Sequence, residues 1–355
     1  MKNIVVVALF MLLNATMGLA QTRVEKKVAT RATGFGITYS LPKTSLIVTV
    51  EEIKTTCMAG PYFRYAERYL GIKDVVMEDN VSYELGKVSL INKGIPDNEN
   101  TYVVEFRSNT VAPYVYLTED GLLCSINTEY DPSVPVTVRE TGSVEPAVNV
   151  EAFFTEELLM AGSVVRQAEV AAKLIYRIRE SKMDILTGEA ENLPPDGEAM
   201  KLQISKLEEH EKALTSLFTG SCSKETAYYD IPFIPRDDVN DDVLFRFSRR
   251  QGVLDADDLG GDPVYINLQV TERALELTPR EAERKERAMK GIIYNVPGKA
   301  RVEIKTTQSP LYRGEVQVVQ FGTRESLAPV MLEDRRNPVK VTFYPETGAI
   351  RHIAH

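Results

Sequence analysis

Residues 155–188, TEELLMAGSVVRQAEVAAKLIYRIRESKMDILTG, contain the longest helical pattern in a sequence that otherwise indicates strands and turns. Thr155 is a typical N-cap residue, and Gly188 is a typical residue at which a helix ends. The apolar positions recur at steps of three and four, which places them on one helix face. They are Leu158, Ala161, Val165, Ala168, Ala172, Ile175 and Ile178. The pattern therefore predicts one helix from Thr155 to Gly188.

A second helix is predicted shortly after the first. Asp196 can cap its first turn, and Gly220 marks its end. Its apolar stripe consists of Met200, Ile204, Leu207, Leu214 and Phe218. Because the connection is short, we expect a long antiparallel helical hairpin that braces the structure on either side. The first helix would extend beyond the second by roughly ten residues.

The segment before the hairpin indicates β structure. β-Branched residues alternate from Gly36 to Cys57 and are interrupted by Pro42, which predicts two strands or one bent strand. Gly60–Gly71 has the signals of a short helix, with Pro61 near its start. Further strands follow up to Val138, and turn clusters at residues 96–100 and 119–121 separate them.

The segment after the hairpin also alternates like strands, at residues 225–233, 243–247 and 263–270. Thr278–Glu281 has the sequence of a capping box and predicts a polar surface helix or an extended loop. The expected fold is therefore α+β and mostly β, with two antiparallel, sandwich-like β modules that flank the helical hairpin. The expected divisions are a signal peptide (1–20), an N-terminal β module (21–150), the hairpin (151–220) and a C-terminal β module (221–355).

An internal resemblance links the two flanks. Residues 36–42, GITYSLP, match residues 291–297, GIIYNVP, and a β-branched alternation follows each copy. More loosely, residues 119–126 resemble residues 346–353. Two related β modules would explain both matches, and chance similarity of short strand and turn segments is the alternative.

The first 20 residues have the pattern of a secretory signal. Lys2 precedes an apolar run from Ile4 to Met17, and Gly18 and Ala20 provide small residues for a signal peptidase. No later segment has the roughly 18 uninterrupted apolar residues of a transmembrane helix. We therefore expect an exported protein of the periplasm or cell surface without a transmembrane anchor after cleavage. A formal charge of -9 argues against nucleic-acid binding.

Three cysteines allow at most one intramolecular disulfide in an oxidising compartment. The pairing to test first is Cys57 with Cys124, because both lie in the first β region. The alternative is that these residues and Cys222 are unpaired and buried as small apolar side chains.

Two groups of residues are candidates for a ligand site. The first is an aromatic surface suited to carbohydrate stacking, with core packing as the alternative: Tyr62, Phe63, Tyr65 and Tyr69. The second is an acidic loop that partly resembles a calcium loop, with solvated turn residues as the alternative: Asp255, Asp257, Asp258 and Asp262. Leu259 and Ile266 stand where a calcium loop needs oxygen ligands. We therefore predict no metal and no cofactor.

Signatures of catalysis are missing. The sequence has three histidines, no Gly-x-Ser-x-Gly segment and no phosphate-binding glycine pattern. His210-Glu211 has Leu214 where a zinc protease needs its second histidine. A cysteine nucleophile with His210 is left open. These observations argue against an enzyme.

Several segments resemble a secreted bacterial family described as domain of unknown function 4831. They are residues 175–188, 192–197, 211–214, 217–220 and 253–260. The resemblance covers most of the chain after the signal. It implies the same β, hairpin, β layout and an envelope location, and it implies no activity and no functional residues.

Together these patterns predict a non-catalytic envelope protein that acts through an interaction or scaffold surface. The partner would be an envelope protein or a glycan, and a homo-oligomer is left open. The alternative is a glycan- or peptide-binding protein or a hydrolase that uses the acidic or the aromatic residues.

Overall fold

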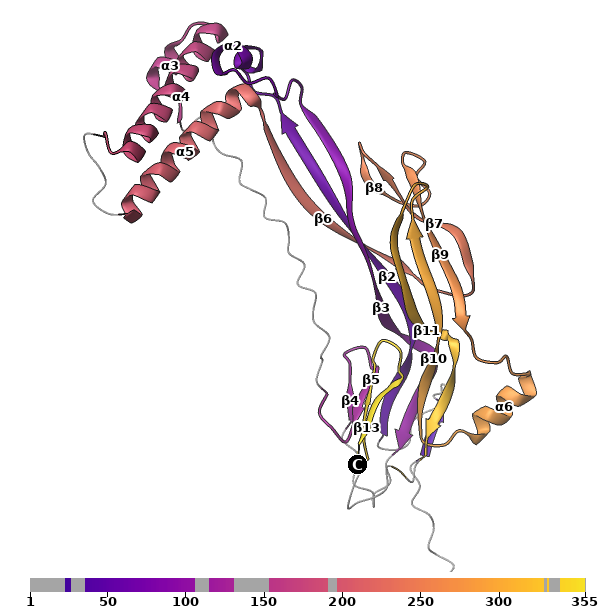
Figure 1. The fold of residues 1–355 in the computed structure, drawn as a ribbon. Coiled ribbons are helices and arrows are strands. Elements are labelled where there is room, and N and C mark those ends of the chain that lie inside the picture. Colours follow the sequence, from indigo (N-terminus) through magenta and orange to yellow (C-terminus); the bar gives the residue numbers. More distant parts are fainter. Residues whose placement is uncertain are drawn as a thin grey trace, which may run out of the picture.

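The structure of the chain is a computed structural model that describes residues 23–26, 36–105, 115–130, 153–190, 197–328, 331 and 339–354. Figure 1 shows an elongated molecule with most of its helices at one end and the β-sheets at the other. The expected signal peptide at residues 1–20 and the expected helix cap Asp196 lie outside the described residues.

Strands make up most of the described chain, and every pairing between them is antiparallel, which confirms the predicted mostly β character. The strands are β1 (Arg23–Lys26), β2 (Gly36–Met58), β3 (Asn80–Glu105), β4 (Val115–Leu117), β5 (Leu123–Ile126), β6 (Ser221–Phe233), β7 (Val239–Ser248), β8 (Gly252–Leu254), β9 (Asp262–Glu272), β10 (Ile292–Lys305), β11 (Pro310–Leu327), β12 (Lys340–Phe343) and β13 (Ile350–Ala354). The helices are the 3-10 helix η2 (Phe63–Tyr65), α2 (Ala66–Leu70), α3 (Glu156–Met160), α4 (Val164–Thr187), α5 (Gly197–Thr219) and α6 (Pro279–Ala288).

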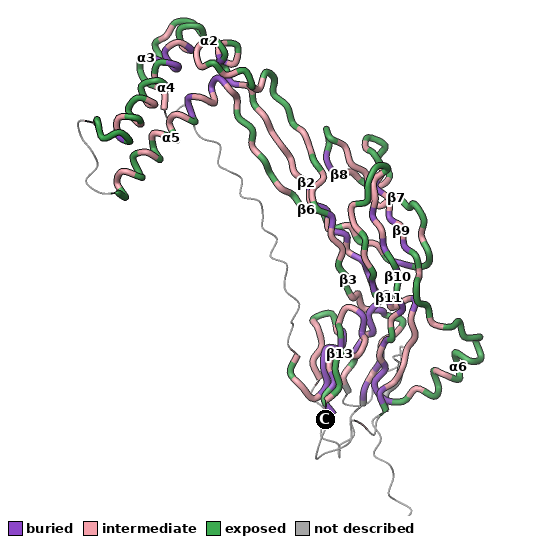
Figure 2. The backbone as a smooth tube through the Cα atoms, in the orientation of Figure 1, coloured by how far each residue is buried: buried purple, intermediate pink, exposed green. Residues whose placement is uncertain are grey.

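The strands form three sheets, with orders β1-β3-β2-β6, β11-β10-β9-β7-β8 and β13-β12-β5-β4. The first two sheets share one apolar core, to which alternating buried residues of β2, β3, β7, β9, β10 and β11 contribute. Its largest fully buried members include Leu46, Phe245, Ile266, Ile304 and Phe321. Figure 2 shows buried backbone concentrated where these sheets meet.

The third sheet closes the far end of the same β body. A second apolar core joins it to the first residues of β2 and β10. Members of that core include Tyr39, Ile126, Ile292, Val341 and Phe343. We call the three sheets together the β body.

The helices α2 to α5 and η2 form a separate helical head with its own apolar core. Ala168 and Ile175 of α4 pack there with Leu214 and Phe218 of α5, and Tyr62 packs against the Phe218 ring at 5.5 Å between centroids. Strands β2, β3 and β6 extend from the β body to the head (Figure 1). We call residues 51–58, 80–87 and 221–228 of these strands the stalk.

Local signals placed most helix ends correctly. The hydroxyl group of Thr155 accepts a hydrogen bond from the Leu158 N–H at 3.4 Å, as expected of an N-cap. Gly188 and Gly220 end α4 and α5 with φ angles of 79° and 77°, where glycine avoids the strain of a side chain. The predicted capping box at Thr278 and Glu281 is present and begins α6.

The prediction of one helix from Thr155 to Gly188 is wrong. The chain leaves the helix at Ala161, and α4 begins only after Ser163, whose hydroxyl group accepts the Arg166 N–H at 3.3 Å. Gly162 lowers the helical preference of the linking residues, and a new N-cap follows it directly. Helices α4 and α5 are therefore close to equal in length, and the expected unpartnered end does not exist.

The expected positions of the helices and the β modules also need correction. The helices lie at one end of the molecule and do not brace the β strands on either side (Figure 1). The sheets do not follow the expected bounds at 150 and 221 either. Strand β6 pairs with β2, and β12 pairs with β5, so two sheets combine strands from both sides of the helices.

The predicted cysteine pairing is wrong. Cys57 forms a disulfide with Cys222, which lies directly opposite it in the β2–β6 register. Cys124 is unpaired and buried among the residues of β5. The alternative of three unpaired cysteines therefore holds only for Cys124.

Candidate functional site

The two copies of the internal resemblance lie at the starts of the two longest hairpins, and each stands opposite a large bulge. In the first hairpin, Ser40 pairs with Thr101 and Pro42 with Pro96, so residues 97–100 of β3 face Leu41 alone. The cluster at 96–100, expected to be a turn between strands, is therefore a bulge within β3.

The second hairpin repeats this arrangement. Val296 pairs with Thr323 and Gly298 with Val318, so residues 319–322 of β11 face Pro297 alone. Proline has no N–H group to donate to a neighbouring strand, which favours a bulge at this point. Gly322 is required here, because a Cβ atom at that position would overlap the carbonyl oxygen of Val296.

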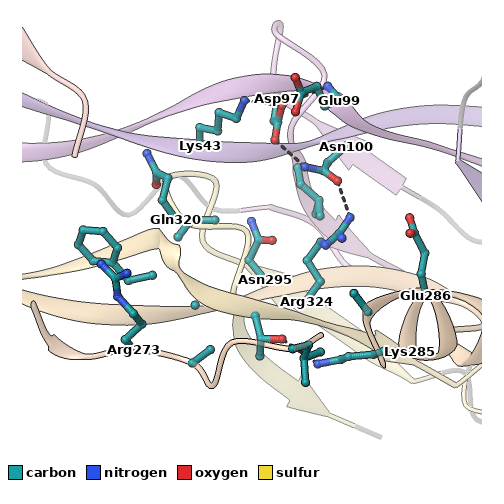
Figure 3. A pocket seen from close by; sticks show the side chains of 18 of the residues that line it. Lys43, Asp97, Glu99, Asn100, Arg273, Lys285, Glu286, Asn295, Gln320 and Arg324 are labelled. Atoms are coloured by element: carbon teal, nitrogen blue, oxygen red, sulfur yellow. Dashed lines mark hydrogen bonds and ion pairs between the residues drawn. The ribbon is translucent and has the colours of Figure 1, made fainter. Parts of the chain in front are cut away.

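The bulges and the segment around α6 enclose a cavity of about 590 Å³, which we call the bulge cavity (Figure 3). Asp97, Glu99 and Asn100 of β3 and residues 319–324 of β11 line it, together with Leu41 to Lys43 of β2. Residues 273–277, which connect β9 to α6, and one side of α6 complete the lining. The cavity therefore lies where the first two sheets and α6 meet.

Asp97 organises the β3 side of the bulge cavity. Its carboxylate binds the Lys43 ammonium group at 2.9 Å and accepts hydrogen bonds from the Asn100 side chain at 2.6 Å and the Glu99 N–H at 3.1 Å. Burial raises the pKa of Asp97, but these bonds to the ionised form outweigh it and leave the pKa below its usual value. The same hydrogen bond to Asp97 raises the pKa of Lys43.

Gln320 fixes the β11 bulge against β2. Its side-chain amide accepts from the Thr44 N–H at 3.1 Å and donates to the Thr44 carbonyl at 2.8 Å, as a neighbouring strand would. The Thr44 hydroxyl group accepts the Val319 N–H at 3.0 Å. Because Thr44 is fully buried, these bonds satisfy backbone groups that water cannot reach.

Arg324 reaches across the cavity from β11. One of its nitrogens, Nη1, donates to the Asn100 side-chain oxygen (Figure 3) and to the Tyr102 hydroxyl group at 3.0 Å. Desolvation raises the pKa of Tyr102, and the positive charge of Arg324 opposes that shift. Arg324 therefore links the two bulges through neutral acceptors.

The α6 side brings further charges and two exposed leucines. Lys285 donates to Thr323 and to Glu325, both at 2.7 Å. Arg273 binds Asp237 at 2.6 Å and lies 5.0 Å above the Phe321 ring. Leu275 is 91% exposed and Leu277 is 46% exposed. The connecting segment therefore places two solvent-accessible apolar side chains in the lining of the cavity.

The aromatic candidates lie in the helical head. Tyr62 is buried, and Tyr65 and Tyr69 pack against the core of the head with ring centroids 6.1 Å apart. Phe63 is half-buried and has the Arg64 guanidinium group 5.5 Å from its ring centroid. Packing accounts for these positions.

The acidic candidates lie in the connection between β8 and β9. Asp255, Asp257, Asp258 and Asp262 are exposed, and Asp258 accepts the Gly260 N–H at 2.8 Å. The Arg246 guanidinium group donates hydrogen bonds to the Ala256 and Gly261 carbonyl groups of this loop at 2.9 and 3.2 Å. Within the described part of the chain, no three His, Cys, Asp or Glu side chains come together in a way that could hold a metal ion.

The cysteines show no features of a nucleophile. Cys57 and Cys222 are joined to each other, and burial raises the pKa of Cys124 to about 11, which keeps its thiol protonated. The His210 ring packs against Phe153, with 4.4 Å between ring centroids. No helix among the described residues is long and apolar enough to cross a membrane.

Sequence reasoning did not identify the bulge cavity. The internal resemblance pointed to one of its walls, and the polar residues at 96–100 were interpreted as an ordinary turn. No sequence motif marks Arg324, Lys285 or Gln320, which lie in ordinary strand and helix segments. The tertiary structure alone brings them together at the bulge cavity.

Comparisons with known proteins gave one match. The family model with the description Domain of unknown function (DUF4831) matches residues 35–351. No curated protein and no solved structure matches the chain.

Proposed function

We propose, from the premise that this chain belongs to the family Domain of unknown function (DUF4831), that it is a non-catalytic exported protein of the cell envelope. The helical head would contact a partner protein, and the β body would hold the head at a distance. The observation that carries this proposal is the separate core of the head, which three strands connect to the β body.

Exposed apolar side chains around the break between α3 and α4 suggest where the head meets its partner. Leu159 and Met160 at the end of α3 are 66% and 78% exposed, and Val164 and Val165 at the start of α4 are 50% and 45% exposed. Four neighbouring apolar residues that face water are typical of a protein interaction surface.

The proposal includes a finer architecture. Helices α4 and α5 would act as an antiparallel hairpin, which is supported by the bonds from Arg179 and Lys182 to Glu211 at 2.6 and 2.9 Å. The first two sheets would act as a sandwich-like pair, which is supported by their common core. Such a rigid body would keep the head in a fixed direction.

Export to the periplasm or the cell surface is supported by the signal-like residues 1–20 and by the disulfide. Disulfides persist in oxidising compartments and are rare in the cytosol. Fractionation of cells that express the full chain, with a variant that lacks residues 2–20, tests this part. Recovery of both forms in the cytosol would overturn it.

Site-specific photo-crosslinking in cells tests the interaction surface. A crosslinker at Leu159 or Met160 should give one discrete adduct, and the same crosslinker at Leu202, 63% exposed on α5, serves as the control. With the crosslinker at Met160, a head-specific partner requires that Leu159→Glu abolishes the adduct. An adduct of twice the chain mass would identify a homo-oligomer, whereas equal labelling from all three positions would contradict the proposed surface.

The alternative of a glycan- or peptide-binding protein or a hydrolase gains no support from the aromatic and acidic candidates, whose positions packing and loop geometry explain. The bulge cavity is the feature that favours ligand binding.

A further inference from the structure

We propose that the bulge cavity is a binding site for a small ligand that carries a carboxylate and an amine beside an apolar group, which is the chemistry of an amino acid or a short peptide. This site is remote from the helical head, so it is independent of the partner surface proposed above.

Arg324 would bind the carboxylate. Its Nη1 already donates to Asn100 and Tyr102, both neutral. Among the described residues, no carboxylate forms an ion pair with Arg324, and its Nε and Nη2 have no hydrogen-bond acceptor. A guanidinium group with two adjacent donors available matches a carboxylate in two parallel hydrogen bonds.

The other cations of the lining are already compensated. Lys43 is paired with Asp97, Arg273 with Asp237, and Lys285 with Glu325. Arg324 is therefore the cation that is left for a ligand within the described lining. One available guanidinium group suits a single carboxylate and is insufficient for a polyphosphate.

Acidic residues of the lining favour an amine on the same ligand. Glu99 of the β3 bulge and Glu276 of the connecting segment contribute to the cavity, and both are exposed. They would repel a ligand with negative charge alone, whereas an ammonium group near them gains favourable electrostatic energy. Figure 3 shows Glu99 on β3 at the edge of the site.

Leu275 and Leu277 would contact the apolar group. The backbone next to them is fixed, because the Ala274 N–H donates to the Phe321 carbonyl at 2.8 Å and α6 begins directly after them. A ligand side chain between these leucines and Met289 would remove apolar surface from water. The cavity volume of about 590 Å³ is in the range of small-molecule sites.

Calorimetric titration of the purified full chain with leucyl-leucine tests the proposal. We expect binding with a Kd below about 1 mM, and weaker binding of both N-acetyl-leucyl-leucine and leucyl-leucine amide, which each lack one charge. Equal binding of the three compounds, or no binding of leucyl-leucine, would overturn the proposal.

Variants locate the site. Arg324→Gln should weaken leucyl-leucine binding about tenfold or more, while Arg313→Gln, at an exposed position on the same strand, should not. Arg324→Gln also removes hydrogen bonds between the bulges, so a second variant is needed that leaves these bonds intact. Leu275→Glu changes an exposed side chain of the lining, and Leu259→Glu, at an exposed position outside the cavity, is its control. Unchanged affinity in Leu275→Glu and a similar affinity in the two arginine variants would contradict the site.

Discussion

Tyr39 shows how one residue joins the two copies of the internal resemblance. Its hydroxyl group accepts the Ile293 N–H at 2.8 Å and donates to the Ile293 carbonyl at 3.1 Å. The side chain is almost fully buried, which raises the pKa of Tyr39 far above its usual value. The hydroxyl group thus satisfies the backbone N–H and carbonyl groups of Ile293, as a neighbouring strand would, at a position that water cannot reach.

The first prediction concerns this hydroxyl group. Tyr39→Phe should lower the free energy of unfolding by about 1–3 kcal/mol, because it leaves a buried N–H and a buried carbonyl group without partners. Urea denaturation measures the change. Tyr294→Phe, at the matching position of the second copy, is the control, because no hydrogen bond involves its hydroxyl group among the described residues. Equal losses in both variants would exclude the proposed role of Tyr39.

The second prediction concerns the pH dependence of the Lys43–Asp97 pair. The pKa of Asp97 is lowered in the folded state, so its contribution is present above the unfolded value of about 4 and is lost as pH falls through the folded value. The pKa of Lys43 is raised, so its contribution is complete below about pH 10 and is lost at higher pH.

Asp97→Asn should therefore cost about 1–3 kcal/mol at pH 7, and the difference from the unmodified chain should shrink below about pH 4. Denaturation at a series of pH values measures it. Asp120→Asn, in an exposed turn, is the matched control and should cost little at any pH. A difference that persists unchanged at low pH would mean that the Asp97 charge is not its source.

At the scale of elements, the bulges of β3 and β11 give the two long hairpins their cavity. A regular ladder would have continued the register past Pro42 and Pro297 and left no space between the sheets. Instead, four residues of each partner strand face a single residue, so each bulge carries three extra residues out of the ladder. Both bulges occur opposite the repeated segment.

The third prediction concerns the stalk. The Cys57–Cys222 disulfide links β2 to β6 at the head, across 165 residues of sequence. Replacing both cysteines with serine should lower the stability by about 2–4 kcal/mol, because the unfolded chain regains the freedom of a long loop. Thermal unfolding measures the loss. A reductant should produce a similar loss in the unmodified chain and no further loss in the double variant, and failure of either result would contradict the stabilising role.

At the scale of the whole molecule, the head and the β body have separate cores joined through the stalk. The stalk residues are mostly half-buried or exposed, and the buried carboxylate of Glu52 attaches them to the β body. It accepts the Val253 N–H at 2.6 Å and the Tyr229 hydroxyl group at 3.2 Å. Such an arrangement favours local unfolding of the head without loss of the β body.

The fourth prediction tests this independence. Phe218→Ala should destabilise the head by about 3–5 kcal/mol, because it leaves a cavity beside Tyr62 in a fully buried core. Hydrogen exchange should then become faster in α4 and α5 and remain unchanged in β10 and β11. Phe245→Ala, in the core of the β body, is the matched control and should have the reverse effect. Similar changes throughout the molecule in both variants would show a single cooperative unit.

The features that the sequence determined by itself are local. The Thr155 cap, the glycines that end α4 and α5, the capping box of α6 and most strand segments follow from hydrogen bonds and side-chain alternation within a few residues. The break before Ser163 was also encoded locally, by Gly162 and a new cap, but the apolar stripe continued across it and favoured one helix. Family membership was visible in the same way, because it depends on short segments of sequence.

The tertiary structure decided which distant segments meet. Cys57 pairs with Cys222 instead of Cys124 because β6 returns to the edge of β2, and no local signal selects that edge. The bulge cavity likewise depends on β3, β11 and α6 arriving together from three parts of the chain. Periodicity identifies the face of a strand, whereas its partner and register depend on the packing of the whole molecule, where many weak apolar contacts are satisfied at once.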